Sequence, residues 1–539
     1  MKYRLLAIFS LFFPLMTFSQ ESAEIGLDEK IDQAFAPVSD FFNTVIFFEI
    51  MGTPFVLILL VGSALFFTLY FGFPNIRHFW TAINVVRGKY DDLEGAEGHG
   101  VEKAEVNIVD GDLPDTIRDE SHEGEVSHFQ ALATAVSGTV GNGNIAGVAL
   151  AIALGGPGAT FWMIICGLLG MSTKFVECTL GVQYRDVDDE GTVYGGTMYY
   201  ISKGLKERGF KTLGKIAAAL FAFFCIGGSF GGGNAAQSNQ ATIVVKELFG
   251  WESTMAGTII GVVLALLVGI IIIGGIKRIA SVTEKVVPFM ALLYILACLY
   301  IIFGNFGLVD DAISLIITEA FNPTAIGVGG VIGVLLVGFR RAAFSNEAGV
   351  GSASIAHSAA KTDEPISEGV VALLEPFIDT VVICTMTALV IVITNYGGNG
   401  AEWAYEGLRS GSEAPLAQID VTSAAFESVM SWFPVVLSGA VILFALSTMV
   451  SWSYYGLKAW TYLFGEGKTN ETIYQILFCV FVVIGSAISA QAVFDFGDAM
   501  IFAMCFPNVF GLYILMPNVR RAFGDYMSRI KSGEIKRVG

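Results

Sequence analysis

Long apolar segments alternate with short polar ones along most of the 539-residue chain. A transmembrane helix needs about 20 predominantly apolar residues, and eleven segments of the chain approach or exceed that length. They lie at residues 46–72, 129–154, 159–182, 213–245, 255–276, 282–303, 326–356, 369–394, 432–463, 471–491 and 494–517. This pattern predicts an all-α polytopic membrane protein with about eleven transmembrane helices.

The composition supports this interpretation. Hydrophobic residues make up 54% of the chain and charged residues only 15%, which excludes an ordinary soluble enzyme and a disordered protein. The expected partner is the lipid bilayer, and no nucleic acid is expected. The seven cysteines are scattered singly through apolar runs, so neither disulfides nor a metal centre beyond sodium is predicted.

The distribution of basic residues predicts the orientation in an inner (plasma) membrane. Residues 1–20 have a basic start, a short apolar stretch and a small-polar finish, which is typical of a signal peptide, with an uncleaved anchor as the alternative. Lysine and arginine gather in every second loop and in the tail, and short cytoplasmic loops hold such an excess. The mature N-terminus is therefore expected outside and the C-terminus in the cytoplasm.

An acidic segment interrupts this pattern. Residues 91–125 contain thirteen Asp and Glu residues against Lys103 and Arg118. Such a charge block is expected to be a solvated, disordered cytoplasmic loop, or else a regulatory lid over an inner gate.

Two apolar segments contain residues that interrupt a helix. Residues 135–147 hold Gly138, Gly141 and Gly143 with interleaved Ser, Thr and Asn, and residues 338–352 hold Ser, Asn and Glu before two glycines. Unwound backbone inside a bilayer is tolerated only where it is buried in protein or lines a cavity. Close helix packing would also explain glycines, but not the accompanying polar side chains.

The second break lies five spans after the first, which is the spacing that an inverted repeat of five plus five helices requires. The predicted organisation is a signal peptide (1–20), a periplasmic segment (21–45), an extra helix with a basic loop (46–90), an acidic insert (91–128), a first repeat (129–303), an outer loop (304–328), a second repeat (329–517) and a cytoplasmic tail (518–539).

Three stretches carry a resemblance to a known family. They are SGTVGNGNIAGVALAIALGGPGATFWM (137–163) continuing through GMSTKFVE (170–177), FSNEAGVGSASIAHSAA (344–360) and STMVSWSYYG (447–456). The sequence resembles the alanine or glycine:cation symporters, also called sodium:alanine symporters. The resemblance implies a LeuT-like fold of the amino-acid–polyamine–cation superfamily and sodium-driven transport of alanine, glycine or sometimes D-alanine. It implies no organic cofactor.

A small zwitterion needs an anion cradle, an acceptor for its ammonium group and apolar walls. The first break offers hydroxyl, amide and backbone N–H groups, and Gln237 matches a substrate-contacting glutamine of the family. Two pairs of residues four apart are expected to form opposite pocket walls. The expected substrate-binding residues are Thr139, Asn142, Gly143, Asn144, Gln237, Phe344, Ala348, Thr448 and Trp452.

The ion site is expected by analogy with similar folds. Sodium would be held by backbone carbonyls of the first break and by two hydroxyls, from Gly138, Val140, Gly141, Ser447 and Thr448. Asn346 and Glu347 are candidates for coupling or gating, and a helix-capping role for Glu347 is the alternative.

Charged residues inside spans need a reason because each costs at least about 2.5 kcal/mol at the bilayer centre. Arg340 and Arg341 are candidate partners of Glu347, and Lys174 and Glu177 are expected to form an ion pair three residues apart.

Three other functions compete with sodium symport. A carboxylate that titrates during transport would allow proton coupling in place of sodium. A channel needs a continuous polar face or filter rings. No HExxH motif or GxGD-type pair occurs, and the midspan carboxylates are not matched with a nucleophile, so the protein is not expected to be an enzyme.

Overall fold

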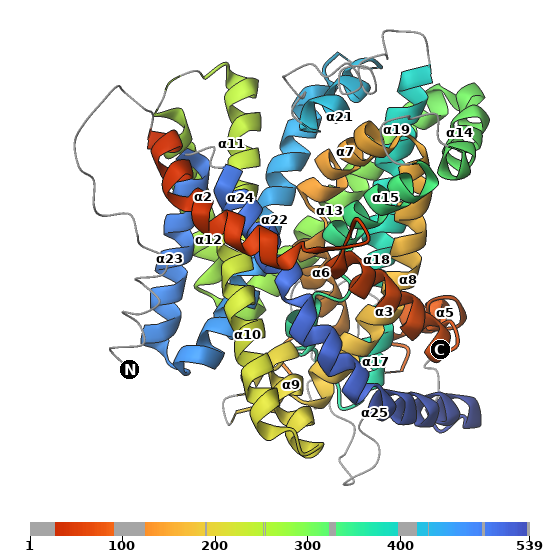
Figure 1. The fold of residues 1–539 in the computed structure, drawn as a ribbon, viewed down its shortest axis with the longest axis vertical. Coiled ribbons are helices and arrows are strands. Elements are labelled where there is room, and N and C mark those ends of the chain that lie inside the picture. Colours follow the sequence, from red (N-terminus) through yellow and green to blue (C-terminus); the bar gives the residue numbers. More distant parts are fainter. Residues whose placement is uncertain are drawn as a thin grey trace.

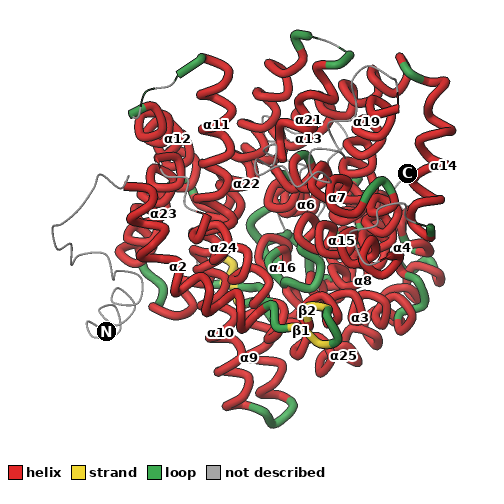
Figure 2. Tube along the Cα trace, turned by 45° about the horizontal axis from the view of Figure 1, so that its top comes forward, coloured by secondary structure: helices red, strands yellow, loops and turns green. Residues whose placement is uncertain are grey.

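The computed structural model describes residues 27–90, 124–188, 191–251, 253, 255–322, 330–396, 418–429, 431–487 and 491–535. Within these ranges the chain is almost entirely helical, as Figure 2 shows. The exceptions are two short antiparallel hairpins, β1 (Glu49–Ile50) with β2 (Thr53–Pro54) and β3 (Asp186–Val187) with β4 (Val193–Tyr194). The predicted signal peptide and residues 91–123 of the acidic insert lie outside the described residues.

Helices occupy all eleven segments predicted to span the membrane. In chain order they are α3 (Phe55–Tyr70), α6 (His128–Thr139) with α7 (Ala146–Gly155), α8 (Gly158–Gln183), α10 (Lys211–Phe230) with α11 (Ala236–Phe249), α12 (Ala256–Ile272), α13 (Gly275–Gly304), α15 (Gly330–Asn346), α17 (Pro365–Val371) to α19 (Thr385–Tyr396), α22 (Phe433–Phe464), α23 (Lys468–Ala487), and α24 (Gln491–Ala503) with α25 (Cys505–Ser532).

The structure contains fewer full-length spans than the sequence pattern predicts. Among the described residues, seven helices are long and apolar enough to cross a membrane, or eight if the bent pair of α6 with η2 (Asn142–Asn144) and α7 is one span. The helices α3 and α12 are apolar but shorter. The eleven spans and their repeat arrangement therefore stay predictions, while the polytopic all-helical fold is confirmed.

In the described parts of the chain, four helices of ten or more residues lie where the sequence pattern predicts no span: α2 (Leu27–Ile46), α9 (Thr197–Glu207), α14 (Val309–Phe321) and α21 (Gln418–Glu427). The helix α14 lies inside the predicted outer loop. The helix α2 packs against α24, and the rings of Phe35 and Phe42 each contact Phe496, with centroids 5.2 and 5.5 Å apart (Figure 1). A search for long apolar runs overlooks helices of mixed polarity, because their apolar residues cover only one face.

The structure confirms the first predicted break. The helix α6 starts with a capping box, in which Ser127 and Gln130 exchange side-chain and backbone hydrogen bonds. It ends at Thr139, where a single 3-10 turn, η2, separates it from α7. The two halves are bent by 63°. The Asn144 side chain holds the turn by accepting a hydrogen bond from the Gly141 N–H at 2.8 Å.

The second predicted break follows α15. Glu347 has a φ of 52°, which is rare for a non-glycine residue, and Gly349 and Gly351 have φ values of 95° and 93°. A methyl group added at Gly351 would lie 2.6 Å from the Thr197 hydroxyl. Glycine is therefore required there both by the backbone conformation and by the close approach of α9.

Long helices surround the two breaks. In Figure 1, α22 and α6 lie near the middle of the bundle, and α22 packs against α6, α10, α11 and α13. Side chains fasten α22 to α6: Ser137 donates to the Ser447 carbonyl at 2.7 Å, and Ser451 donates to the Thr134 carbonyl at 2.8 Å. On the other side, α8 packs against α15, α17 and the short helix α16 (Ala353–His357).

Candidate functional site

The structure brings the two breaks into direct contact. The Asn144 Nδ2 group of the first break donates to the Ser345 hydroxyl of the second at 3.1 Å. A methyl group added at Gly143 would lie 3.8 Å from the Phe344 ring and from the Ser345 Cα. Residues about 200 positions apart thus form one buried polar region. We call it the break site, and its members are Gly141, Asn142, Gly143, Asn144, Gln237, Ser345, Asp379 and Thr448.

Three of the predicted substrate-binding side chains meet at the first break. Asn142 donates to the Gln237 Oε1 atom at 3.1 Å, and Gln237 donates onward to the Gly232 carbonyl at 3.2 Å. A methyl group at Gly141 would lie 2.9 Å from the Thr448 hydroxyl and 3.7 Å from Gln237 Oε1. Thr448 therefore packs tightly against Gly141, and any side chain at this position would displace its hydroxyl.

One acceptor at the break site has no partner among the described residues. The Asn142 Oδ1 atom is buried and accepts no hydrogen bond from them. Leaving such an atom unsatisfied costs about 1–3 kcal/mol, so a ligand that supplies an N–H group or a cation would be stabilised there.

The predicted wall residue Trp452 is buried and closes one side of this region. Its ring lies against α6 and the glycine run between α10 and α11, and its Nε1 group donates to the Gly138 carbonyl at 3.3 Å. A methyl group at Gly233 would lie 2.3 Å from the indole. Gly233 belongs to η3 (Gly231–Ala235), a π-helical turn, and such turns are frequent at functional sites.

Other predicted residues are placed differently. The Thr139 hydroxyl donates back to the Val136 carbonyl at 3.2 Å and so points along its own helix. Phe344 and Ala348 do not share a helical face, because α15 ends at Asn346 and the chain then turns. Ala348 lies against Gly170 of α8, with 2.8 Å between its Cβ and a methyl group added there.

Phe344 lines a small pocket of about 40 Å³ beside α15. Four charged residues share this pocket: Arg340, Arg341, Asp495 and Asp498. The predicted pairing of Arg340 or Arg341 with Glu347 is therefore wrong. Glu347 instead accepts a hydrogen bond from Ser352, because the reversal of the chain at Glu347 turns it away from α15.

The side chains of the predicted sodium ligands do not all point toward one place. The Thr448 hydroxyl donates to the Ser137 carbonyl at 3.1 Å, beside Gly141. The Ser447 hydroxyl points toward α13, where it approaches the Met290 sulfur at 3.6 Å, and it donates to the Phe444 carbonyl of its own helix at 3.0 Å. Val140 is buried at the end of α6, and its N–H donates to the Val136 carbonyl.

Asp379 is a site residue that the sequence analysis did not select. It lies in η5 (Phe377–Cys384), a second π-helical segment. Its carboxylate accepts hydrogen bonds from Asn144 at 2.6 Å, Ser345 at 2.8 Å and Thr380 at 2.7 Å. All three donors are neutral, so they do not balance its charge. The available signal was a carboxylate in the middle of an apolar span, which is costly without a functional reason.

Asn346, the second gating candidate, holds the second break together. Its side chain donates to the Thr380 hydroxyl at 3.0 Å and accepts from the Ala348 N–H at 3.0 Å.

The predicted ion pair between Lys174 and Glu177 is also wrong. The Lys174 ammonium bonds the Glu375 carboxylate at 2.9 Å, and both side chains are fully buried. Glu177 accepts a hydrogen bond from Asn508 at 2.6 Å instead. A partner 201 residues away along the chain leaves no local sequence signal.

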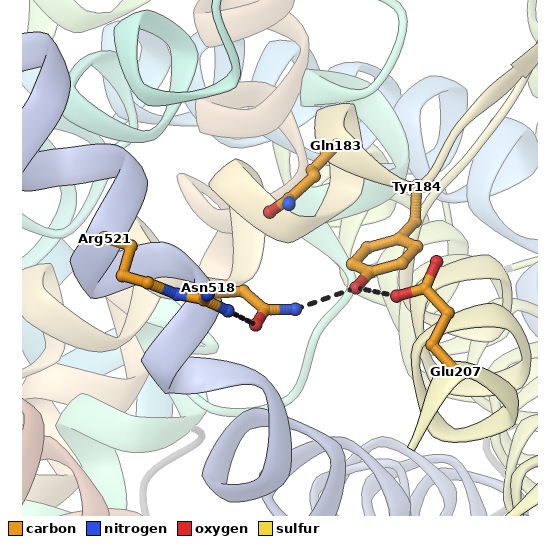
Figure 3. Close-up of a pocket in the computed structure, with 5 residues that line it drawn as sticks. All are labelled: Gln183, Tyr184, Glu207, Asn518 and Arg521. Atoms are coloured by element: carbon orange, nitrogen blue, oxygen red, sulfur yellow. Dashed lines mark hydrogen bonds between the residues drawn. The ribbon is translucent and has the colours of Figure 1, made fainter. Parts of the chain in front are cut away.

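A larger pocket of about 410 Å³ lies at the end of α8, away from the break site (Figure 3). Its lining residues are Gln183, Tyr184, Glu207, Asn518 and Arg521. The Tyr184 hydroxyl donates to Glu207 at 2.8 Å and accepts from Asn518 at 3.0 Å. Burial, with the neighbouring Glu207 carboxylate, raises the pKa of Tyr184 to about 12. None of the predicted site residues lines this pocket.

Known proteins resemble this chain over most of its length. The sequence profile of the sodium:alanine symporter family matches residues 110–538. A sodium/alanine symporter, AgcS, of Methanococcus maripaludis is 39% identical over 86% of this chain and 92% of its own length. Two Bacillus subtilis proteins are also similar: the amino-acid carrier AlsT (33% identical, 88% of this chain, 90% of its own) and the probable sodium/glutamine symporter GlnT (31% identical, 90% of each).

Among solved structures, MhsT in complex with L-phenylalanine covers 74% of this chain and 99% of its own, with 13% identity and a TM-score of 0.45. That similarity is too distant to support an argument. The profile match over most of the chain and the identity to full-length relatives decide the family instead. The chain belongs to the sodium:alanine symporter family, and it is a membrane transporter rather than an enzyme.

Proposed function

We propose that the protein is a secondary active symporter that imports alanine or glycine, with D-alanine as a further candidate, and that sodium drives this import by alternating access. It acts in the inner membrane, with the mature N-terminus outside and the C-terminus in the cytoplasm. The names of its relatives include both sodium/alanine and sodium/glutamine symporters. The residues of the break site therefore have to distinguish between these substrates.

The observation that carries the proposal is the Asn142 oxygen at the break, which has no partner among the described residues. An amino acid offers an ammonium group that can donate to this oxygen, beside the Gln237 amide. Its carboxylate would lie toward the backbone N–H groups that open α7, where a helix N-terminus favours a negative charge. Asn142 would thus lie between the ammonium group and the carboxylate of the bound amino acid.

The walls favour a small side chain. Trp452 fills the space against Gly233, and the Thr448 hydroxyl lies 2.9 Å from the position of a methyl group on Gly141. A pocket bounded by a rigid indole and by hydrogen-bonded helices does not adapt its volume easily. Alanine and glycine therefore fit better than glutamine.

Sodium is the coupling ion that the site suits best. The ion is a hard cation that prefers oxygen ligands, and the Thr448 hydroxyl lies beside the backbone of Gly141 at the break. Asp379 adds a negative charge that its neutral partners leave uncompensated, and a cation nearby would lower the cost of burying it. A proton on Asp379 would also remove that cost, which makes proton coupling the second candidate.

The proposal is tested by uptake of radiolabelled alanine into proteoliposomes with an inward sodium gradient, an inward proton gradient or neither. Accumulation above the external concentration with sodium alone is expected. Accumulation with a proton gradient alone would indicate that protons, and not sodium, drive the import. Equilibration without accumulation under every gradient would indicate a channel, and absence of any alanine or glycine uptake would contradict the proposed substrate.

A further inference from the structure

A chain of titratable side chains runs through the protein apart from the break site. His128 of α6 and His357 of α16 each direct Nδ1 at one oxygen of the Glu368 carboxylate in α17. The other nitrogen of His357, Nε2, faces Glu375 Oε2 of α18 (Leu374–Pro376) at 3.7 Å. The second oxygen of Glu375 bonds Lys174 of α8 at 2.9 Å. We call these five residues the charge network.

No hydrogen bond joins His357 Nε2 to Glu375 Oε2, which lie 3.7 Å apart. Both His357 Nε2 and Glu375 Oε2 are buried, and neither has a hydrogen-bond partner among the described residues. Since Nδ1 must be protonated to donate to Glu368, a neutral His357 would direct the lone pair of Nε2 at a carboxylate oxygen. Two acceptors would then face each other. One additional proton on Nε2 turns this repulsion into a charge-assisted hydrogen bond.

The balance of charges also favours a proton on His357 Nε2. Glu368 and Glu375 are both fully buried, and Lys174 supplies one positive charge for the two carboxylates. An isolated buried charge is far more costly than a paired one. With His357 as an imidazolium, two cations match two anions within one connected network.

Other titratable groups surround the network and do not reverse this balance. Around it lie Glu177 and Cys178 of α8, Glu347 at the second break, and Tyr455 of α22. Glu177 and Glu347 are carboxyl groups that interact electrostatically with Lys174, while Cys178 and Tyr455 add no cation. None of these neighbours therefore opposes a further proton on the histidine pair.

The charge network is buried and connects several helices. His128 is 7% exposed, whereas the Glu368, His357, Glu375 and Lys174 side chains are 0% exposed. All five side chains are therefore buried. The network joins α6 and α8 to α16, α17 and α18, so a movement that parts these helices would also part the groups that hold the proton.

We propose that His357 is a proton-binding site, in which an imidazolium bridges Glu368 and Glu375, separate from the sodium site at the break. Proton binding there favours the packed arrangement of α8 on α17 and α18.

Nitrogen NMR of histidine-labelled protein tests the proposal, because the chain has only five histidines. The sample is a variant in which His78 and the two histidines of the 91–123 segment, His99 and His122, are replaced by Gln, so that His128 and His357 remain. The spectrum is recorded at about pH 8, where an imidazole with an ordinary pKa of about 6.5 has lost its second proton. At least one ring with both nitrogens protonated is expected.

Two further variants assign the signal. His357→Gln should remove the doubly protonated ring, and Glu375→Gln should shift the His357 Nε2 signal to that of an unprotonated nitrogen. If either variant fails to fold, the two-histidine protein still decides: two neutral rings at about pH 8 would overturn the proposal. A doubly protonated ring that persists unchanged in His357→Gln would assign the proton to His128 and would also overturn it. None of these measurements requires substrate, so the outcome is independent of the proposed function.

Discussion

The break site and the charge network both join helices that are far apart in the sequence, but they use opposite chemistry. At the break site, uncharged amides and hydroxyls bond to one another and to one buried carboxylate, Asp379, and one amide oxygen has no partner among the described residues. The charge network contains a fully buried ion pair, Lys174 with Glu375. A neutral hydrogen bond contributes only about 0.5–1.5 kcal/mol net, whereas removing one member of a buried ion pair costs about 3–5 kcal/mol.

This difference indicates a division of roles. Weak neutral bonds can be exchanged for bonds to a ligand at little cost, which suits a site that must bind and release a substrate. Buried ion pairs resist separation, which suits a contact that holds helices in one arrangement. Mutations should therefore affect stability at the network and ligand affinity at the break site.

The largest effect is expected for Lys174→Met in the charge network. Removing the ammonium leaves the buried Glu368 and Glu375 carboxylates one cation short, and the free energy of unfolding should fall by about 3–5 kcal/mol. Thermal unfolding in detergent measures this loss. The control is Lys203→Met, whose bond to Asp186 is largely exposed and contributes about 0–1 kcal/mol. Equal losses in the two variants would contradict the role given to the network.

Asp379→Asn should act on the coupling ion at the break site. The amide keeps the shape of the side chain but removes the negative charge, so the apparent affinity for sodium should fall about tenfold or more, at about 1.4 kcal/mol for each factor of ten. Sodium dependence of alanine uptake measures this change. Asp311→Asn at the exposed start of α14 is the control. An unchanged sodium dependence would remove Asp379 from the ion site.

Trp452→Ala should relax the size limit of the pocket. Loss of the indole opens space beside Gly233, and uptake of larger amino acids relative to alanine should rise about tenfold, since each extra methylene in a tight pocket changes discrimination by about 1–3 kcal/mol. Competition with valine and leucine measures the ratio. The exposed Trp432→Ala serves as the control, and an unaltered ratio in Trp452→Ala would contradict the wall assignment.

Gln237→Ala should give the smallest effect. The substitution removes one neutral amide beside Asn142, which corresponds to about 1 kcal/mol, or about a fivefold weaker affinity for alanine. Equilibrium binding at saturating sodium measures the affinity. Gln475→Ala provides a matched control, because its amide bonds the Ile272 carbonyl on α12 instead. Equal affinities in wild type and Gln237→Ala would exclude Gln237 from the site.

The sequence predicts what local chemistry determines. Both helix breaks can be predicted because glycines and neighbouring Asn residues, at Gly141, Gly143, Gly349 and Gly351, have a low helix propensity. The apolar segments are all helical in the structure. The sequence also grouped Asn142, Gln237 and Thr448, and in the structure these side chains lie around Gly141.

What the sequence does not predict depends on long-range contacts. The spacing along one helix predicts that Lys174 pairs with Glu177, but its ion-pair partner in the structure is Glu375 on another helix. Asp379 bonds Asn144, which lies 235 residues away along the chain. Phe344 and Ala348 do not follow one helix, because the chain reverses between them at Glu347.

The most direct test of the account is an experimental structure of the protein with alanine and sodium bound. The account predicts density for alanine at the break site, with its ammonium group on Asn142 Oδ1 and Trp452 against its methyl group. The charge network should contain neither ligand. Alanine bound elsewhere, such as in the pocket lined by Tyr184 and Arg521, would contradict the assignment of the site.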